Sequence, residues 1–399
     1  MRSKNLAKVL RKVHDFRLSL SYRIRLLFEG PRESILTRDF YTDEDIFNLE
    51  KTNIFSKLWL FIGVTNELME PNSWVIKKVI NKEILITYDG DKYHGVENVC
   101  PHKNMRLKSE KTGKGPLVCR YHAWSFQLDG SLVKIPGFDK SYLLTDSQMK
   151  RTCLKSFQIK QVGNFLFINL DSEPIPFEEQ FDTKIIRSLK LLSHKLSPEI
   201  GTFFEIRKFN WKLNFENLRD AMHPAVVHAS TLAKDVDFSE QHVQQKPLTQ
   251  TLRDIELPEA SSLSKDGEHK TENRGHLGNI ISPSLSEGYY NWLLYPNFHM
   301  ATPDGGRSYS IEVLNPISPV ETEISHYILC NKPNDENDVF LEEVVEHRLR
   351  GLRPVLEEDY EACEEVQHAL RFTELEQNIG AYEHYNANIA SMYRRLIGR

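Results

Sequence analysis

Two short motifs in the first half of the chain each combine one cysteine with one histidine. They are Cys100-Pro-His102 and, after sixteen intervening residues, Cys119-Arg-Tyr-His122. Two thiolates and two imidazoles can hold a zinc ion or an iron–sulfur centre. Zinc fingers usually group the cysteines apart from the histidines, whereas two loops that each supply one of both can clamp a [2Fe–2S] cluster with Cys₂ on one iron and His₂ on the other. The pattern therefore favours this cluster, with structural zinc as the alternative.

A second group of chemically capable residues lies in the stretch from Asn210 to His228. It contains Asp220, His223 and His228, with Pro224 between the two histidines. On a straight helix Asp220 and His223 share a face, but His228 turns away from it. A kink or π-bulge at Pro224 would bring the two imidazoles together. The spacing favours metal ligation over an amphipathic helix with two incidental histidines.

Two histidines alone make a poor iron site, so a carboxylate is expected from elsewhere. Residues 354–372 predict an acid-rich helix with one apolar stripe, formed by Leu356, Tyr360, Cys363, Val366 and Leu370. At about 100° per residue, Asp359 falls within the sector of that stripe. The other acids are expected to point away: Glu357, Glu358, Glu361, Glu364 and Glu365. A carboxylate on a buried face must be paired or metal-bound. We therefore predict Asp359 as the third ligand, and a salt bridge to a core cation is the alternative.

Composition limits the class of protein. A chain of 399 residues predicts about two domains. A net charge of −5 and a pI near 6.3 give no global basic field, so nucleic acid is not expected as a partner. No apolar run approaches the ~20 residues that span a membrane. Five cysteines, an odd number, indicate a reduced, cytoplasmic protein. Cys153, Cys330 and Cys363 have no ligand-like setting and are expected to be core thiols.

The pattern along the chain predicts three parts. Residues 1–57 are expected to be a helical segment that packs on the catalytic domain, 58–172 a small all-β domain, and 173–399 the catalytic domain. Strands are predicted in the last part at 203–211, 289–301, 309–314 and 324–330. Residues 257–288 read as a long polar surface loop, a candidate lid. From about residue 337 the chain is predicted to be helical, with interruptions at Pro354 and Gly380.

With these elements in order, the chain resembles the α subunit of the Rieske non-heme iron oxygenases, the aromatic-ring-hydroxylating dioxygenase family. The resemblance covers the chain from about Phe40 onward. The motifs that carry it are Cys100-Pro-His102, Cys119-Arg-Tyr-His122-Ala-Trp, Asn210-Trp-Lys, Glu216-Asn217, Asp220-x-x-His223-x-x-x-x-His228 and Glu358-Asp359. It implies an α+β protein: a small all-β Rieske [2Fe–2S] domain plus a helix-grip catalytic domain, an antiparallel sheet with long helices, that holds mononuclear Fe(II).

The resemblance also implies roles for individual residues. Cys100, His102, Cys119 and His122 would bind the cluster, while His223, His228 and Asp359 would bind iron. Asp220 would bridge His223 to His122 of a neighbouring subunit in a homotrimeric ring. Three positions depart from the family pattern: Lys103-Asn104 stands where Arg-Gly is common, Ala123 where glycine is common, and Met222 where an aromatic residue is common.

The expected function is that of a terminal oxygenase. It would use O₂ and electrons from NAD(P)H, delivered by a separate reductase with or without a ferredoxin, because no GxGxxG fingerprint follows a strand in this chain. The leading prediction is hydroxylation or cis-dihydroxylation of an aromatic or other small organic substrate, with or without a small β subunit. The alternative is monooxygenation that ends in N- or O-demethylation. A plain electron-transfer Rieske protein is the alternative from another class.

Overall fold

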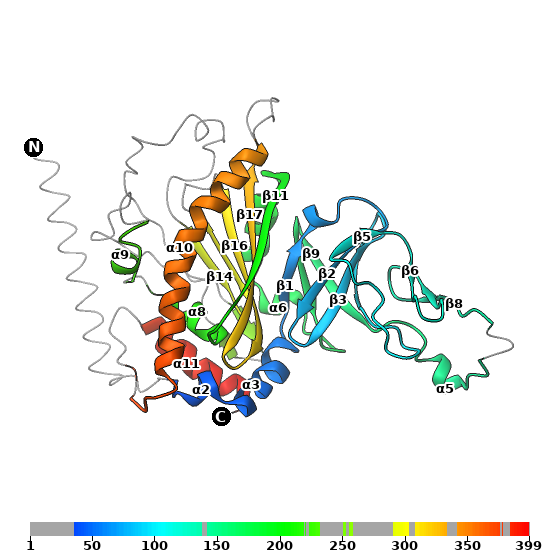
Figure 1. The fold of residues 1–399 in the computed structure, drawn as a ribbon, viewed down its shortest axis with the longest axis horizontal. Helices are drawn as coiled ribbons and strands as arrows, with labels where there is room; N and C mark the ends of the chain where they lie inside the picture. The colour runs from blue at the N-terminus through cyan, green and yellow to red at the C-terminus, as the bar shows by residue number, and fades with distance from the viewer. Residues whose placement is uncertain are drawn as a thin grey trace, which may run out of the picture.

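The chain is built around two antiparallel sheets, one on each side of the molecule (Figure 1). The structure is a computed structural model, and it describes residues 36–137, 142–218, 220, 223–231, 250–252, 255–257, 290–302, 308–332, 341–375, 377 and 384–398. The first 35 residues of the predicted N-terminal segment, the polar loop at 258–288, Met222 and Gly380 lie outside these residues. Within them, no helix is both long enough and apolar enough to cross a bilayer.

The first sheet has seven strands in the order β1-β10-β9-β4-β3-β2-β5. Their bounds are β1 Leu60–Val64, β2 Ser73–Val79, β3 Lys82–Tyr88, β4 Tyr93–Glu97, β5 Thr112–Lys114, β9 Ser156–Val162 and β10 Phe165–Asn169. A smaller sheet joins β6 Leu117–Val118, β7 Ser125–Phe126 and β8 Leu132–Lys134, and the short helix α5 covers Asp146–Met149. All of these pairings are antiparallel. The all-β character predicted for this part of the chain is therefore confirmed.

The second sheet has five strands in the order β11-β17-β16-β15-β14 and carries the long helices. Its strands are β11 Leu196–Arg207, β14 Tyr290–Leu294, β15 Phe298–Thr302, β16 Ser308–Ser318 and β17 Glu321–Asn331. The helices are α6 Phe177–Gln180, α7 Thr183–Ser193, α8 Trp211–Asn217, α9 Pro224–Val227, α10 Leu341–Ala369 and α11 His384–Ile397; β12 Gln250–Leu252 pairs with β13 Ile255–Leu257. Helix α10 packs across β11 and β17 (Figure 1). This is the helix-on-sheet arrangement that the resemblance implies.

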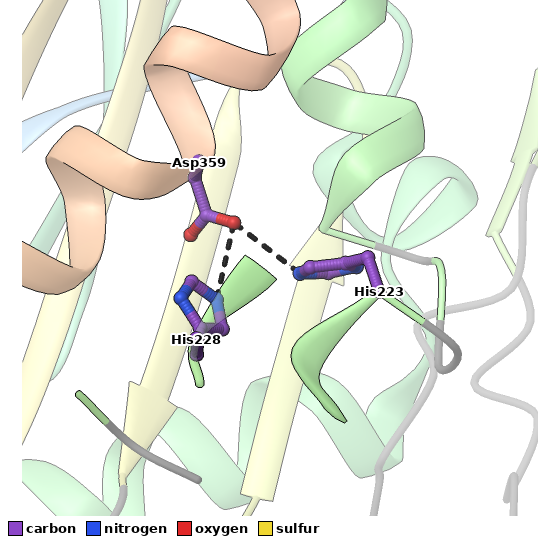
Figure 2. A group of neighbouring side chains, drawn as sticks. All are labelled: His223, His228 and Asp359. Atoms are coloured by element: carbon purple, nitrogen blue, oxygen red, sulfur yellow. Dashed lines mark ion pairs between the residues drawn. The ribbon is translucent and has the colours of Figure 1, made fainter. Parts of the chain in front are cut away.

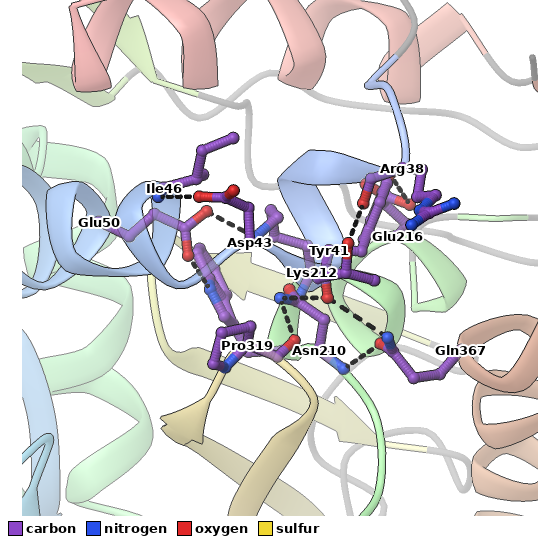
Figure 3. Close-up of polar contacts among 12 residues, drawn as sticks. Arg38, Tyr41, Asp43, Ile46, Glu50, Asn210, Lys212, Glu216, Pro319 and Gln367 are labelled. Atoms are coloured by element: carbon purple, nitrogen blue, oxygen red, sulfur yellow. Dashed lines mark hydrogen bonds and ion pairs between the residues drawn. The ribbon is translucent and has the colours of Figure 1, made fainter. Parts of the chain in front are cut away.

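The N-terminal helices α2 Asp39–Thr42 and α3 Glu44–Glu50, followed by the π-helical turn Lys51–Phe55, lie against α8 (Figure 3). The hydroxyl of Tyr41 donates to Glu216, 2.9 Å away. The buried carboxylate of Glu50 accepts from the indole of Trp211 and forms an ion pair with Lys212, which is fully buried. Two desolvated charges are tolerated here because they pair with each other and with hydrogen-bonding neighbours.

Several predicted elements differ from the observed ones. The strand predicted at 203–211 begins seven residues earlier and stops at Arg207, because the Asn210 side chain accepts from the Lys212 amide and starts α8. The strand predicted at 289–301 is a hairpin of β14 and β15, since Pro296 has no amide to donate to a ladder.

The interruption predicted at Pro354 is wrong, because α10 runs through this residue without a break. A proline inside a helix costs about 3 kcal/mol. Pro354 lies on the exposed side of α10, where the lost hydrogen bond is open to water. Burial of Leu356 and Tyr360 on the other side of the helix offsets the cost.

Two further predictions concern burial. Cys330 and Cys363 are buried as expected, but Cys153 is exposed, because it follows the short helix α5 at the surface. Val366, assigned to the buried stripe of α10, is also exposed. The buried side of α10 continues instead through Gln367 and Leu370.

Candidate metal centres

The two Cys-His motifs form matching turns next to the small sheet. In each turn the cysteine carbonyl accepts from the amide four residues on, and the cysteine amide donates to the carbonyl five residues on. The residues at the fourth positions, Asn104 and Ala123, both have φ of +56°. This left-handed conformation is one that glycine adopts freely, that asparagine tolerates and that alanine resists. Both departures from glycine noted in the sequence therefore fall on left-handed backbone positions, and the one at Ala123 is strained.

The four side chains of these turns converge. The rings of His102 and His122 lie 4.5 Å apart, and the indole of Trp124 stacks on His102. Both histidine Nδ1 atoms are buried with no hydrogen-bond partner among the described residues. Burial and the neighbouring Cys119 thiol raise the pKa of Cys100 to about 11. Two buried thiols and two unpartnered Nδ1 atoms fit a Cys₂His₂ cluster, whose positive irons would supply the missing partners.

A second group of candidate ligands lies between α8, α9 and α10 (Figure 2). His223 and His228 flank α9, and Asp359 reaches them from α10. The Nε2 atoms of both histidines lie 3.2 Å from Oδ1 of Asp359. One ligand atom from each of the three residues can be chosen so that all lie within 4.8 Å of one another. The structure thus brings together the three residues predicted to bind iron.

The kinked helix predicted around Pro224 is not what brings the histidines together. Helix α8 ends at Asn217, and α9 is a separate short helix with Pro224 at its first position. Proline is favoured there because its missing amide would be unpaired in any case. A histidine at each end of a four-residue helix can turn toward the same point without a bulge.

Further polar groups orient these three candidate ligands. The amide of Asn217 donates to Oδ1 of Asp359 at 2.9 Å. Nδ1 of His228 lies 2.9 Å from Glu358, which also accepts from the hydroxyls of Ser230 and Thr231. A carboxylate on Nδ1 fixes the tautomer that presents Nε2 to a metal. The prediction that Glu358 points away is therefore wrong: it holds the far side of a predicted iron ligand.

Asp220 lies beside the first histidine. Its Oδ2 is 3.6 Å from Nδ1 of His223, an ion-pair distance longer than a hydrogen bond. Burial alone would lower the pKa of His223, but Asp220 and Asp359 outweigh it and raise the pKa to about 9. Burial would raise the pKa of Asp359, but the two histidines hold it well below its usual range. Both pKa shifts indicate a site with excess negative charge, which favours binding of a positive charge. In this structure the protons on the imidazoles supply that charge.

The spacing of the donors also fits a metal. Ligands bound at about 2.1 Å and about 90° to one another lie about 3 Å apart. The 3.2 Å separations from Asp359 Oδ1 to both Nε2 atoms are close to this value. Two histidines and one carboxylate on one side of a metal leave other positions open, as in non-heme Fe(II) oxygenases. The site fits mononuclear iron.

The two centres lie far apart within one chain. In Figure 1 the small sheet with β6 and β8 and the short helix α9 are at opposite ends of the molecule, with both large sheets between them. A direct path for electrons inside one copy would have to cross the whole fold. The four residues predicted to bind a cluster and the three predicted to bind iron thus form two separate groups.

Family comparisons agree with both centres. Residues 58–158 match the Rieske [2Fe–2S] domain, and residues 191–398 match the ring-hydroxylating α subunit, catalytic domain. The second match covers more than half of the chain. The protein therefore belongs to the ring-hydroxylating α-subunit family, and it is a Rieske-type terminal oxygenase subunit that uses a [2Fe–2S] cluster and mononuclear iron.

Among individual proteins, the chain is similar to several monooxygenases. The carnitine monooxygenase oxygenase subunit of Acinetobacter baumannii is 26% identical over 83% of this chain and 84% of its own length. Choline monooxygenase of Amaranthus tricolor is 26% identical over 83% of this chain and 70% of its own. The glycine betaine monooxygenase oxygenase subunit of Pseudomonas aeruginosa is 32% identical, over 47% of this chain and 43% of its own.

Solved structures share the fold. A quaternary ammonium Rieske monooxygenase in complex with L-carnitine has a TM-score of 0.66 at 21% identity, covering 90% of this chain and 95% of that one. Naphthalene 1,2-dioxygenase from Rhodococcus sp. has a TM-score of 0.70 at 16% identity, covering 91% and 94%. At these identities the likeness establishes the α+β architecture of a Rieske domain plus a catalytic domain and nothing finer.

Proposed function

We propose that this protein is a monooxygenase that acts on a small quaternary-ammonium compound. The observation that carries the proposal is the similarity to carnitine monooxygenase along most of both chains, joined to an assembled His223, His228 and Asp359 site. Of the two outcomes expected from the sequence, it favours the monooxygenation that ends in demethylation or a similar C–N cleavage. No feature of the described residues specifically supports an aromatic hydrocarbon as the substrate.

The proposed reaction inserts one oxygen atom into a C–H bond next to the quaternary nitrogen. The substrate, O₂, two electrons and two protons give an alcohol and water. An N-hydroxymethyl group then releases formaldehyde and leaves the tertiary amine. When bound, the cluster supplies single electrons and the iron activates dioxygen. Asn217, Glu358 and Asp220 keep the ligands oriented, so that the metal is held in one geometry.

We further propose that electrons cross between copies of the chain. Family members take electrons from a separate reductase, and the two centres of one copy lie at opposite ends of it (Figure 1). A homotrimeric ring would bring the cluster of one copy next to Asp220 of the next, which is partly exposed beside His223. A ferredoxin and a β subunit remain optional parts of the proposal.

The division of the chain is part of the same proposal. We assign residues 58–172 to the Rieske domain, 173–399 to the catalytic domain and 1–57 to a segment that packs on the latter. The contacts of Tyr41 and Glu50 with α8 support the last assignment for the described part of that segment.

Product analysis tests the proposal. The protein is purified anaerobically, its iron and sulfide are quantified, and it is supplied with NADH and a Rieske-oxygenase reductase. L-Carnitine, choline, glycine betaine and naphthalene are then offered in turn. We expect formaldehyde or a free amine from a quaternary-ammonium compound, with one NADH oxidised for each product. A cis-diol from naphthalene, and no product from the other three compounds, would contradict the proposed substrate class.

The variant His223→Ala separates an oxygenase from an electron-transfer protein. An oxygenase loses its product while the visible spectrum of the cluster is preserved. If the variant keeps all redox function of the parent protein, including product formation, the iron site has no catalytic role.

A further inference from the structure

A buried carboxylate behind the iron site hydrogen-bonds to two side chains, and each of these has a second polar atom without a partner. Glu312 on β16 accepts from Nδ1 of His299 at 2.8 Å, from the hydroxyl of Tyr360 at 2.8 Å and from the amide of Asn214 at 3.3 Å. Nε2 of His299 and Oδ1 of Asn214 are buried with no hydrogen-bond partner among the described residues. Buried polar atoms are rarely left unpaired, so each calls for an explanation.

The sheet register shows which way these side chains face. His299, Glu312 and His326 are direct cross-strand partners on β15, β16 and β17, and directly opposed residues share a face. The next residues on β15 and β16, Met300 and Val313, pack in the core on the opposite face. The His299 row therefore faces α8 and α10, the helices next to the iron ligands.

Two contacts connect this row to the iron site. On α8, Asn214 and Asn217 lie three residues apart and share a face; Asn214 donates to Glu312 and Asn217 donates to Asp359. On α10, Tyr360 follows Asp359 and reaches the same Glu312 carboxylate. His299 lies one strand beyond Glu312, on the side away from His326. The Glu312 carboxylate thus connects His299 to α8 through Asn214 and to α10 through Tyr360.

The chemistry of Glu312 decides what the two unpaired atoms offer. Burial would raise the pKa of this carboxyl, but the His299 hydrogen bond and the nearby histidines hold it below its ordinary value, so the group is ionised. A carboxylate only accepts, so Nδ1 of His299 carries a proton and the NH₂ of Asn214 turns toward Glu312. Nε2 of His299 and Oδ1 of Asn214 remain, and Oδ1 is an acceptor. A hydroxyl group complements these two atoms, because it can both donate and accept.

We propose that His299 Nε2, assisted by Asn214 Oδ1, binds a hydroxyl group of the substrate and orients its reacting carbon toward the iron site. This inference rests on the proposed function and narrows its substrate class to hydroxyl-bearing quaternary-ammonium compounds. The negative charge of Glu312 suits a cation nearby. A substrate without the hydroxyl leaves both buried atoms unpaired and binds more weakly.

Two ligand pairs that differ in one hydroxyl test the subsite. Dissociation constants are measured anaerobically by calorimetry on the protein with both metal centres loaded, for L-carnitine against γ-butyrobetaine and for choline against ethyltrimethylammonium. We expect the hydroxyl compound of a pair to bind about tenfold more tightly or better. Equal affinities within each pair in the parent protein overturn the subsite without any variant being needed.

Variants then locate the effect. His299→Asn keeps a donor for Glu312 but removes the ring nitrogen Nε2, so the preference for the hydroxyl should fall to about onefold. His326→Asn is the matched control, because His326 lies in the same row and also faces Glu312, but it is covered by Tyr360 and Phe203. It should keep the preference. A preference that survives in His299→Asn, or falls equally in both variants, overturns the proposal.

The outcomes for the subsite and for the proposed function are distinct. If none of the four compounds binds the parent protein, the proposed substrate class fails and this subsite fails with it. If the compounds bind with equal affinity whether or not they carry the hydroxyl, only the subsite fails. The proposed quaternary-ammonium monooxygenation is then still tested by product analysis.

Discussion

Replacement of Glu358 by glutamine should weaken iron binding without disturbing the Rieske cluster. The carboxylate lies 2.9 Å from Nδ1 of His228 and also accepts from Ser230 and Thr231. Glutamine keeps the volume but offers one acceptor and one donor group, so at least one of the three donors loses its partner. The ring of His228 is then free to rotate or to change tautomer, and Nε2 is no longer fixed toward Asp359.

The magnitude follows from what such partners do at metal sites. Removal of a carboxylate that orients a metal-bound histidine costs 10–100-fold in affinity, about 1.4–2.7 kcal/mol. We expect the upper half of this range, because the site has two such histidines and the other carboxylate, Asp220, is 3.6 Å from its ring and holds it more loosely. Fe(II) dissociation constants are measured anaerobically by competition with a chelator, and absorption spectra monitor the cluster.

Glu357→Gln is the matched control. Glu357 is the adjacent acid on α10 and forms an ion pair with Arg207, away from the triad. Its loss should change iron affinity by less than twofold. If Glu358→Gln binds Fe(II) as tightly as the parent protein, or if both variants weaken it equally, then Glu358 does not orient His228 and the carboxylate–histidine argument is refuted.

Three other predictions follow from the same contacts. Ala123→Gly should stabilise the protein by about 1 kcal/mol in urea unfolding, because φ at this position is +56°. Ala362→Gly within α10 should destabilise it by a similar amount. If both variants change the unfolding free energy in the same direction, the strain argument is contradicted. In iron-free protein the raised pKa of His223 stabilises the fold, and this contribution of about 3 kcal/mol is fully present below about pH 6.5 and should be lost as pH rises to about 9. Unfolding free energies measured at pH 6.5 and pH 9 test this, and an unchanged free energy would refute the prediction. Lys212→Met should lower the free energy of unfolding by about 3–5 kcal/mol, since Glu50 is left buried without its cation. Adding Glu50→Gln should recover much of that loss. If the double variant is as unstable as Lys212→Met alone, the unpaired Glu50 is not the cause of the loss.

Ligand identity was the part of the site most accessible from sequence. Cysteine and histidine in matched pairs, and two histidines near an acid, are uncommon enough that residue type and spacing select them. Asp359 emerged from helical periodicity, because the buried side of α10 is set by the sheet under it. The three triad residues come together as expected, and their roles as ligands remain a prediction for metal analysis.

The role of Glu358 could not be predicted in this way. A helical wheel distinguishes only the face that packs on the sheet from the face that does not. Glu358 lies about 100° from Asp359 and meets α9, which packs on the flank of α10 rather than beneath it. The position of α9 depends on where α8 ends, and nothing in the run from Asn217 to Pro224 gives that break a sequence signal strong enough to place it.

The Rieske-type turns show the opposite case, in which sequence departures had a structural meaning that only φ angles reveal. Lys103-Asn104 and Ala123 stand where the family commonly has Arg-Gly and glycine. The structure places Asn104 and Ala123 at the same left-handed position of two equivalent turns. Asparagine at this position is cheap and alanine is costly, so the second turn carries backbone strain next to the buried His122 Nδ1.

The N-terminal helices explain how ligands from distant parts of the chain keep one geometry. The histidines follow α8, whereas Asp359 is more than 130 residues later on α10, and a metal site tolerates errors of only about 0.5 Å. The carbonyl of Tyr41 accepts from Asn210 at the start of α8 and from Gln367 two turns beyond Asp359 (Figure 3). One buried carbonyl thus joins the start of α8 to α10. This gives the N-terminal segment a physical role in holding the site: it fixes the distance between the two elements that must meet at the metal.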